Sequence, residues 1–256
     1  MGSVVRGNDI HHLLKGFYSN KMGYMIIENN SFHDDYLYGI DPHTGTHDMI
    51  IRNNKVHHNN ATAVVCSKDC YNILIEGNEA YNNLDTHRGI AFSVNSDHSI
   101  AQNNYVHDQD ICIGVNRFSD YNEIYNNTLS DCNTAIDLTD TSNNIVYENK
   151  IVGAKDGLVL KSVTNKIFNN KIYNSTNGIV LIHTSNNNEI ANIDSTNYDT
   201  IYTHFLDQVN TGNEVKDTKN PITVITNPVK SETDFAQTDF ENNTKLIEEG
   251  IKNNFI

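Results

Sequence analysis

The most unusual segment of this sequence is Tyr38-Gly39-Ile40-Asp41-Pro42-His43. A histidine imidazole exchanges its proton near neutral pH, so His43 can act as a general base. The phenol of Tyr38 can carry a second proton. Proline inside a strand removes a backbone hydrogen-bond donor, so Pro42 indicates an edge, a kink or an exposed turn. The segment therefore predicts a proton-transfer site, with Asp41 next to its base.

Cationic side chains follow at two later points of the chain. A cation can stabilise the negative charge that develops when a proton is removed. Lys68 and the pair His87-Arg88 offer such groups, and they lie one and two sequence repeats after the first segment. Repeats that stack as neighbouring strands lie about 4.8 Å apart. We therefore expect six side chains to converge on one groove: Tyr38, Asp41, His43, Lys68, His87 and Arg88.

A repeat of 21 to 26 residues must position these side chains. Its signature is apolar-x-Asn-Asn-x-apolar, as in Ile51-Arg52-Asn53-Asn54-Lys55-Val56. A small residue followed by alternating apolar residues runs in the same phase, as in Gly157-Leu158-Val159-Leu160. A unit of this length cannot bury its own apolar face, so the units must stack. The second Asn of the signature falls at residues 8, 30, 54, 78, 104, 127, 149 and 170.

Short strands of alternating apolar and polar residues, separated by Asn, Gly and Asp turns, fit a parallel β-helix. The Leu-x-x-Leu-x-Leu frame of leucine-rich repeats is absent. We predict an all-β, right-handed parallel β-helix of about eight coils of ~22 residues. The 41 asparagines then have a structural role, because an Asn amide can take the left-handed turn and bond the same Asn of the next coil.

The end of the chain has a different character. Eight coils reach about residue 195, and the stretch 196–230 is less regular. Ser231-x-x-Asp234 resembles a helix start, and the following apolar residues can form one stripe. We therefore predict a β-helix domain over residues 1–230 and a capping helix or tail over residues 231–256. The first coil has no comparable cap, which favours an upstream segment or a partner at that end.

Composition narrows the function classes. The net charge of -14 argues against nucleic acid as a partner, because phosphate binding needs a basic surface. It does not exclude an acidic partner of another kind, since a groove on an acidic protein can be locally basic. The sequence has no apolar run long enough to span a membrane and no signal-peptide run. The four cysteines have no metal-site spacing, so we expect buried thiols for Cys66 and Cys70, no metal and no cofactor.

The histidines and the repeat lengths point to the same part of the chain. Ten of the 12 histidines precede residue 108. The spacing of the repeated Asn is also longest between residues 30 and 104, at 24 to 26 residues. Extra residues in a coil enter its turns, and turns build binding sites on a rigid scaffold. We therefore expect the site among these wider coils.

Tyr38-Gly39-Ile40-Asp41-Pro42-His43, followed by Thr46-His47-Asp48-Met49, resembles the Asp-Pro-His segment of the mannuronan (alginate) C-5-epimerases. Residues 16–83 are similar to the corresponding coils of that family, including Gly16-Phe17-Tyr18 before the motif. The later coils match only as general β-helix repeats. The resemblance implies an isomerase that abstracts the C5 proton of a uronate within a polymer and returns a proton to the opposite face.

The same resemblance implies a role for each matching residue. His43 corresponds to the catalytic histidine, Tyr38 to the second proton-transfer group, and Asp41 to the aspartate that holds the substrate carboxylate and orients the histidine. Lys68 stands where some members carry an Arg that neutralises this carboxylate, without the two-pronged geometry of a guanidinium. The pair His87-Arg88 matches an Arg-His pair in reversed order. The predicted substrate-binding residues are Lys68, Arg88, His87 and Tyr18.

Three functions remain open from the sequence. The first is a polyuronate C5-epimerase, converting mannuronate to guluronate in alginate. The second is a polyuronate lyase, which uses the same base and the same cation but protonates the leaving oxygen at C4. The third is a β-helix that binds carbohydrate without catalysis. A polysaccharide partner predicts an extracellular or cell-envelope location, and the oligomeric state is left open.

Overall fold

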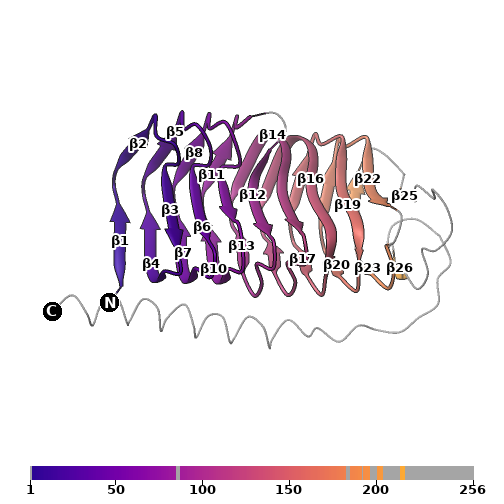
Figure 1. The fold of residues 1–256 in the computed structure, drawn as a ribbon. Coiled ribbons are helices and arrows are strands. Elements are labelled where there is room, and N and C mark those ends of the chain that lie inside the picture. The colour runs from indigo at the N-terminus through magenta and orange to yellow at the C-terminus, as the bar shows by residue number, and fades with distance from the viewer. Residues whose placement is uncertain are drawn as a thin grey trace.

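The computed structural model describes residues 2–84, 87–182, 185–191, 193–196, 201–203 and 214–216, where all 26 elements are β-strands. Figure 1 shows these strands stacked in successive coils along one axis, from β1 near the N-terminus to β26. Each strand pairs in parallel with strands of the neighbouring coils. The prediction of an all-β solenoid of about eight coils is confirmed for the described part of the chain.

The strands form three rows along this axis. The first row is one sheet: β1 (Ser3–Arg6), β4 (Gly23–Glu28), β7 (His47–Arg52), β10 (Tyr71–Glu76), β13 (Ile100–Gln102), β15 (Glu123–Tyr125), β17 (Ile145–Tyr147), β20 (Lys166–Phe168), β23 (Glu189–Ala191) and β26 (Glu214–Lys216). The second row contains β2 (Asp9–His11), β5 (Ser31–His33), β8 (Lys55–His57), β11 (Glu79–Tyr81), β18 (Lys150–Val152), β21 (Lys171–Tyr173) and β24 (Asp194–Thr196).

The third row carries the predicted site residues. It contains β3 (Phe17–Asn20), β6 (Ile40–His43), β9 (Val64–Cys66), β12 (Arg88–Ser93), β19 (Asp156–Val163), β22 (Asn177–Leu181) and β25 (Ile201–Thr203). Two long strands run through the bend between the second and third rows and join them into one sheet: β14 (Tyr105–Asn116) and β16 (Thr128–Ser142).

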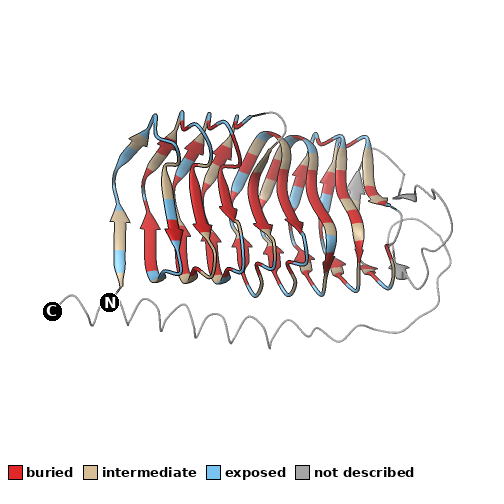
Figure 2. Ribbon diagram, in the orientation of Figure 1, coloured by how far each residue is buried: buried red, intermediate tan, exposed pale blue. Residues whose placement is uncertain are grey.

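The core lies inside the coils. Alternate side chains point inward and stack on the matching residue of the next coil, as Ile27, Ile51 and Ile75 do in register on β4, β7 and β10. Figure 2 shows buried residues along the strands and exposed residues at the bends. Inward stacking of Ile, Val and Leu removes apolar surface that no single coil can bury, so the coils stabilise one another.

The repeated asparagines form the predicted ladder at the bend between the first and second rows. Asn54 donates its side-chain amide to Asn78 Oδ1 at 3.0 Å and to the backbone oxygen of Ile27 at 2.9 Å. The residue before each ladder position lies in the left-handed region, as Asn53 does with φ of 53°. Gly77 takes this place in one coil, where a Cβ atom would lie 2.6 Å from Asn53 Oδ1.

Two further amide ladders occupy the other bends, and the sequence repeat did not reveal them. Each Asp or Asn member accepts the backbone N–H of a residue one coil earlier through its side-chain oxygen, and Gln109 Oε1 accepts the side-chain amide of Asn83. One ladder contains Asp35, Asn59, Asn83 and Gln109. The other contains Asn122, Asn144, Asn165 and Asn188. Much of the asparagine excess is therefore explained by three ladders rather than one.

Replacing Asp35 with asparagine is expected to stabilise the protein by about 1 kcal/mol at pH 7. Asp35 is buried, and its Oδ2 has no hydrogen-bond partner among the described residues. Burial raises the pKa of this carboxyl, so ionising it costs the folded state stability as pH rises through that pKa. An amide supplies the donor that the other ladder members carry. Urea denaturation at pH 7 measures the gain, and a loss of stability would contradict this account.

Stacked rings cover the outer side of the second row. His33 and His57 are parallel with ring centroids 5.1 Å apart, and Tyr81 stacks on His57 at 4.9 Å. His11 and His107 extend the stack at either end. The periodicity of the coils, rather than a catalytic requirement, explains why these histidines recur.

The contribution of His57 to this stack is expected to weaken as pH falls. Burial, followed by the nearby His58 and His33, lowers the pKa of His57 in the folded protein. The unfolded chain, with a histidine pKa of about 6.5, then binds the proton more tightly, so stability is lost as pH falls from about 6.5 through the folded pKa. The variant His57→Gln should show a smaller loss of unfolding free energy between pH 7.5 and pH 5. An unchanged slope in urea denaturation would contradict this role.

The predicted capping helix at 231–256 and the domain boundary at 230 lie outside the described residues. Cys66 and Cys70 are buried free thiols, as predicted. Cys112 and Cys132 pair as a disulfide between adjacent coils, with Cα atoms 6.0 Å apart. The part of the chain that the structure describes contains no helix of the length and hydrophobicity that a membrane span requires.

Candidate functional site

Strand β6 holds the Asp-Pro-His motif and explains how its residues are presented. Ile40 and Pro42 belong to the buried side of the strand, as strand alternation requires. Asp41 and His43 therefore point outward. Because Pro42 has no backbone N–H, strand β6 lacks one hydrogen-bond donor. The backbone oxygen of Pro42 still accepts the N–H of Ser67 at 2.9 Å.

Asp41 points outward and is nevertheless 0% exposed. Lys15 covers it, with Nζ 2.7 Å from Asp41 Oδ2, and the hydroxyl of Ser67 donates to Oδ1. These partners come from the coils before and after β6. A buried carboxylate with a cation and a hydroxyl on its two oxygens is a fixed group, because losing either partner would leave it partly unsatisfied.

Lys15 also connects the aromatic residues of the site. Its Nζ lies 4.1 Å from the ring centroid of Tyr18 and 5.4 Å from that of Tyr38. Sequence reasoning missed Lys15, although a signal was present. Lys15 precedes Gly16 just as Tyr38 precedes Gly39. The backbone N–H of Gly16 donates to the backbone oxygen of Tyr38. The repeat phase therefore puts Lys15 beside Tyr38 one coil earlier.

His43 lies at the edge of this cluster and is partly exposed. Its Nδ1 is 2.6 Å from Thr44 Oγ1, and its ring lies 5.5 Å from that of Tyr18, measured between centroids. When Nδ1 donates to Thr44, Nε2 presents a lone pair and can accept a proton. Thr44, rather than Asp41, makes the hydrogen bond that orients this imidazole.

The structure brings together four of the seven predicted residues: Tyr18, Tyr38, Asp41 and His43. Lys68 lies in an exposed turn after β9, where its backbone oxygen accepts the N–H of Gly45. Arg88 reaches in the opposite direction, toward Asp137. His87 is partly buried before β12, where its backbone N–H donates to the backbone oxygen of Leu84 and its backbone oxygen accepts the N–H of Ile111.

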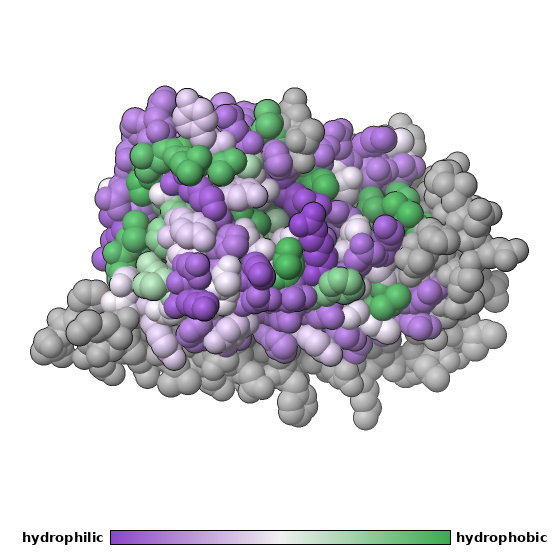
Figure 3. All heavy atoms as spheres, in the orientation of Figure 1, coloured by the Kyte–Doolittle hydropathy of each residue, from purple (hydrophilic) through white to green (hydrophobic). Residues whose placement is uncertain are grey.

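Exposed apolar side chains precede the cluster in each of its first two coils. Leu13 and Leu14 come before Lys15, while Tyr36 and Leu37 come before Tyr38. On the face drawn in Figure 3, hydrophobic side chains also gather over the N-terminal coils, at the upper left. The part of the chain that the structure describes has no group of three or more acidic, histidine or cysteine side chains suited to a metal ion.

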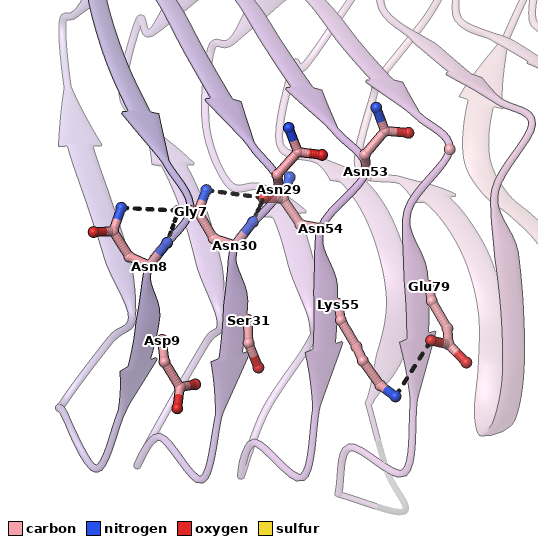
Figure 4. Close-up of a pocket in the computed structure, with 11 residues that line it drawn as sticks. Gly7, Asn8, Asp9, Asn29, Asn30, Ser31, Asn53, Asn54, Lys55 and Glu79 are labelled. Carbon is pink, nitrogen blue, oxygen red and sulfur yellow. Dashed lines mark hydrogen bonds and ion pairs between the residues drawn. The ribbon is translucent and has the colours of Figure 1, made fainter.

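A hollow lies over the asparagine ladder of the first coils (Figure 4), between the first and second rows. Its polar lining is engaged within the fold: Asn8 and Asn30 donate to the next ladder residue, and Lys55 pairs with Glu79 at 3.6 Å. Figure 4 shows these bonds running along the ladder. We therefore place the candidate active site at β3 and β6, and not in this hollow.

Comparison with known proteins extends these observations. The family described as "Right handed beta helix region" matches residues 2–113 and 92–195. A mannuronan C5-epimerase from Pseudomonas putida is 25% identical over 161 residues, which are 62% of this chain and 26% of that protein. A second, from Pseudomonas syringae pv. tomato, is 26% identical over 137 residues, which are 53% of this chain and 21% of that protein. The chain spans about a quarter of the length of these relatives.

Solved structures share the fold at lower identity. The periplasmic alginate epimerase AlgG has a TM-score of 0.55 at 19% identity, covering 83% of this chain and 50% of that one. The A-module of the Azotobacter vinelandii mannuronan C-5 epimerase AlgE4 has a TM-score of 0.57 at 18% identity, covering 78% and 62%. An alginate lyase from Paenibacillus sp. has a TM-score of 0.55 at 11% identity, covering 84% and 97%.

These likenesses agree with the coil stacking. The chain therefore belongs to the right-handed β-helix family and resembles mannuronan C5-epimerases.

Proposed function

We propose that this protein is a polysaccharide C5-epimerase that acts on a polyuronate and converts mannuronate to guluronate in alginate. The observation that carries the proposal is the cluster of Lys15, Tyr18, Tyr38, Asp41 and His43 on the outer side of β3 and β6. It combines a base, phenols and a cation in one place. The names of the curated relatives support the same reaction.

Each group has a role in this reaction. Lys15 binds the uronate carboxylate and stabilises the charge that develops when the C5 proton leaves. His43 Nε2 accepts that proton, and Tyr38 delivers a proton to C5 from the opposite face of the sugar ring. Asp41 and Ser67 fix the position of Lys15 and of the strand. One proton leaves and one returns, so the reaction needs no oxidant or reductant.

A lyase is the second candidate, because an alginate lyase shares the fold and the first half of the mechanism is common to both reactions. Proton NMR of polymannuronate after incubation with the protein separates them. New guluronate signals support the epimerase, whereas unsaturated chain ends that absorb in the ultraviolet support the lyase. Binding without either product, on several polyuronates, would support a carbohydrate-binding protein. With a polysaccharide substrate, we place the protein in the periplasm or outside the cell.

Lys15 and Lys68 are the two candidates for the cation that neutralises the substrate carboxylate. We expect Lys15→Gln to lower kcat/KM on polymannuronate by about 100-fold, because it removes the cation nearest the phenols and Asp41. Lys68→Gln, in the exposed turn, is the matched control and should change kcat/KM by less than about threefold. A larger loss for Lys68→Gln would return the role to Lys68. Since Lys15→Gln also unpairs Asp41, the double variant Lys15→Gln with Asp41→Asn separates loss of folding from loss of catalysis.

A further inference from the structure

The outer side of the third row forms a low floor between two buried carboxylates. One column of outward positions contains Val65 on β9, Ala91 on β12 and Gly114 on β14, in register with one another. Asp137 on β16 follows Gly114, and Asp41 lies at the other end, since Ile40 pairs with Val64. The residues between the two aspartates are small and buried, so no long side chain of this column stands between them.

Arg88 lies across this floor. Its side chain is laid flat on Gly114, where a Cβ atom would be 2.3 Å from Arg88 Nε and 2.5 Å from Cδ. Its Nη2 is 3.6 Å from Asp137 Oδ2. Asp137 is buried and is also held by the Thr139 hydroxyl at 2.7 Å, so the anchor of this arginine is fixed.

The guanidinium retains binding capacity in this position. The Arg88 side chain is 28% exposed, whereas its Nε is buried without a hydrogen-bond partner among the described residues, so a ligand meets the exposed part of the guanidinium. A guanidinium carries five N–H donors in a planar fork that fits a carboxylate, and one ion pair with Asp137 uses only part of them. Only a glycine at position 114 leaves space for the Arg88 side chain in this position.

We propose that Arg88, seated on Gly114 and anchored by Asp137, binds the carboxylate of a second uronate in the same polymer chain. This inference rests on the proposed function. The coil of Gly114 lies three coils after the coil of His43. At about 4.8 Å per coil the separation is about 14 Å, which a single sugar ring does not span. Arg88 is then a specificity-determining residue for chain length, with Gly114 and Asp137 as its positioning residues.

The test measures binding by isothermal titration calorimetry, with a mannuronate disaccharide and a mannuronate octasaccharide as probes. We expect Arg88→Gln to raise the octasaccharide Kd by at least about tenfold and to leave the disaccharide Kd unchanged. Arg88→Lys should recover part of the affinity. Equal octasaccharide affinity in wild type and Arg88→Gln would overturn the proposal.

Gly114→Ala tests the seat without removing the charge. The new methyl group meets only the Arg88 side chain within 3.5 Å, so we expect the fold to persist and the octasaccharide Kd to rise as in Arg88→Gln. Asp137→Asn should also raise the octasaccharide Kd, by a smaller factor. The control is Arg6→Gln, which removes another arginine paired with a carboxylate, Glu28, on the first row. An octasaccharide Kd that Gly114→Ala leaves unchanged would overturn the positioning role.

The outcomes also separate this proposal from the proposed function. Octasaccharide binding that depends on Arg88, without new guluronate signals, keeps the subsite and rejects the epimerase. Epimerisation that is indifferent to Arg88→Gln at every chain length keeps the epimerase and rejects the subsite. A wild-type protein that binds no oligomer of mannuronate, guluronate or galacturonate rejects both.

Discussion

Replacing His43 with alanine is expected to lower kcat on polymannuronate by about 10³-fold, within the range of a general base. The imidazole is held by Thr44 and offers Nε2 beside the ring of Tyr18. Time-resolved proton NMR of the guluronate signals measures the loss.

The matched control is His47→Ala. His47 is also a partly buried histidine, but it lies on β7 in the first row, where it bonds Asp48 and stacks on Tyr71. It should retain activity within a small factor. An active, folded His43→Ala protein would remove His43 from the mechanism.

Replacing Asn78 with alanine is expected to cost about 3–5 kcal/mol of unfolding free energy, because several buried polar groups lose partners at about 1–3 kcal/mol each. Asn78 is 1% exposed. Its Oδ1 accepts the backbone and side-chain amides of Asn54 at 2.9 and 3.0 Å. Its Nδ2 donates to the backbone oxygen of Ile51 and to Asn104 Oδ1.

Asn60→Ala provides the comparison for this variant. Asn60 is exposed, lies outside the three ladders and is not in the left-handed region, so its loss should cost less than about 0.5 kcal/mol. Urea denaturation of both variants gives the difference. Equal stability of the two would show that the ladder contributes little beyond the stacked apolar core.

The repeat and its phase could be identified from the sequence alone. Strands in register turn a spacing of about 24 residues into spatial neighbours, so the phase of Asn54 and Asn78 also aligned Ile51 with Ile75. The same phase put Asp41 and His43 on the outer side of a strand, because side chains alternate along it. The second and third ladders follow the same spacing of 21 to 26 residues, but they escaped notice because the second includes Asp35 and Gln109 in place of Asn.

The partners of the motif required the tertiary structure. The repeat phase puts Lys15 and Lys68 on the coils before and after Asp41. Lys68 nevertheless lies in an exposed turn, whereas the Lys15 side chain reaches across the coil boundary to the Asp41 carboxylate. Turns do not obey the two-residue alternation of strands, and a shift of one residue reverses the side on which a side chain emerges. Sequence periodicity therefore determined which residues are neighbours, and only the packed structure decided where their flexible side chains end, at Asp41 for Lys15 and at Asp137 for Arg88.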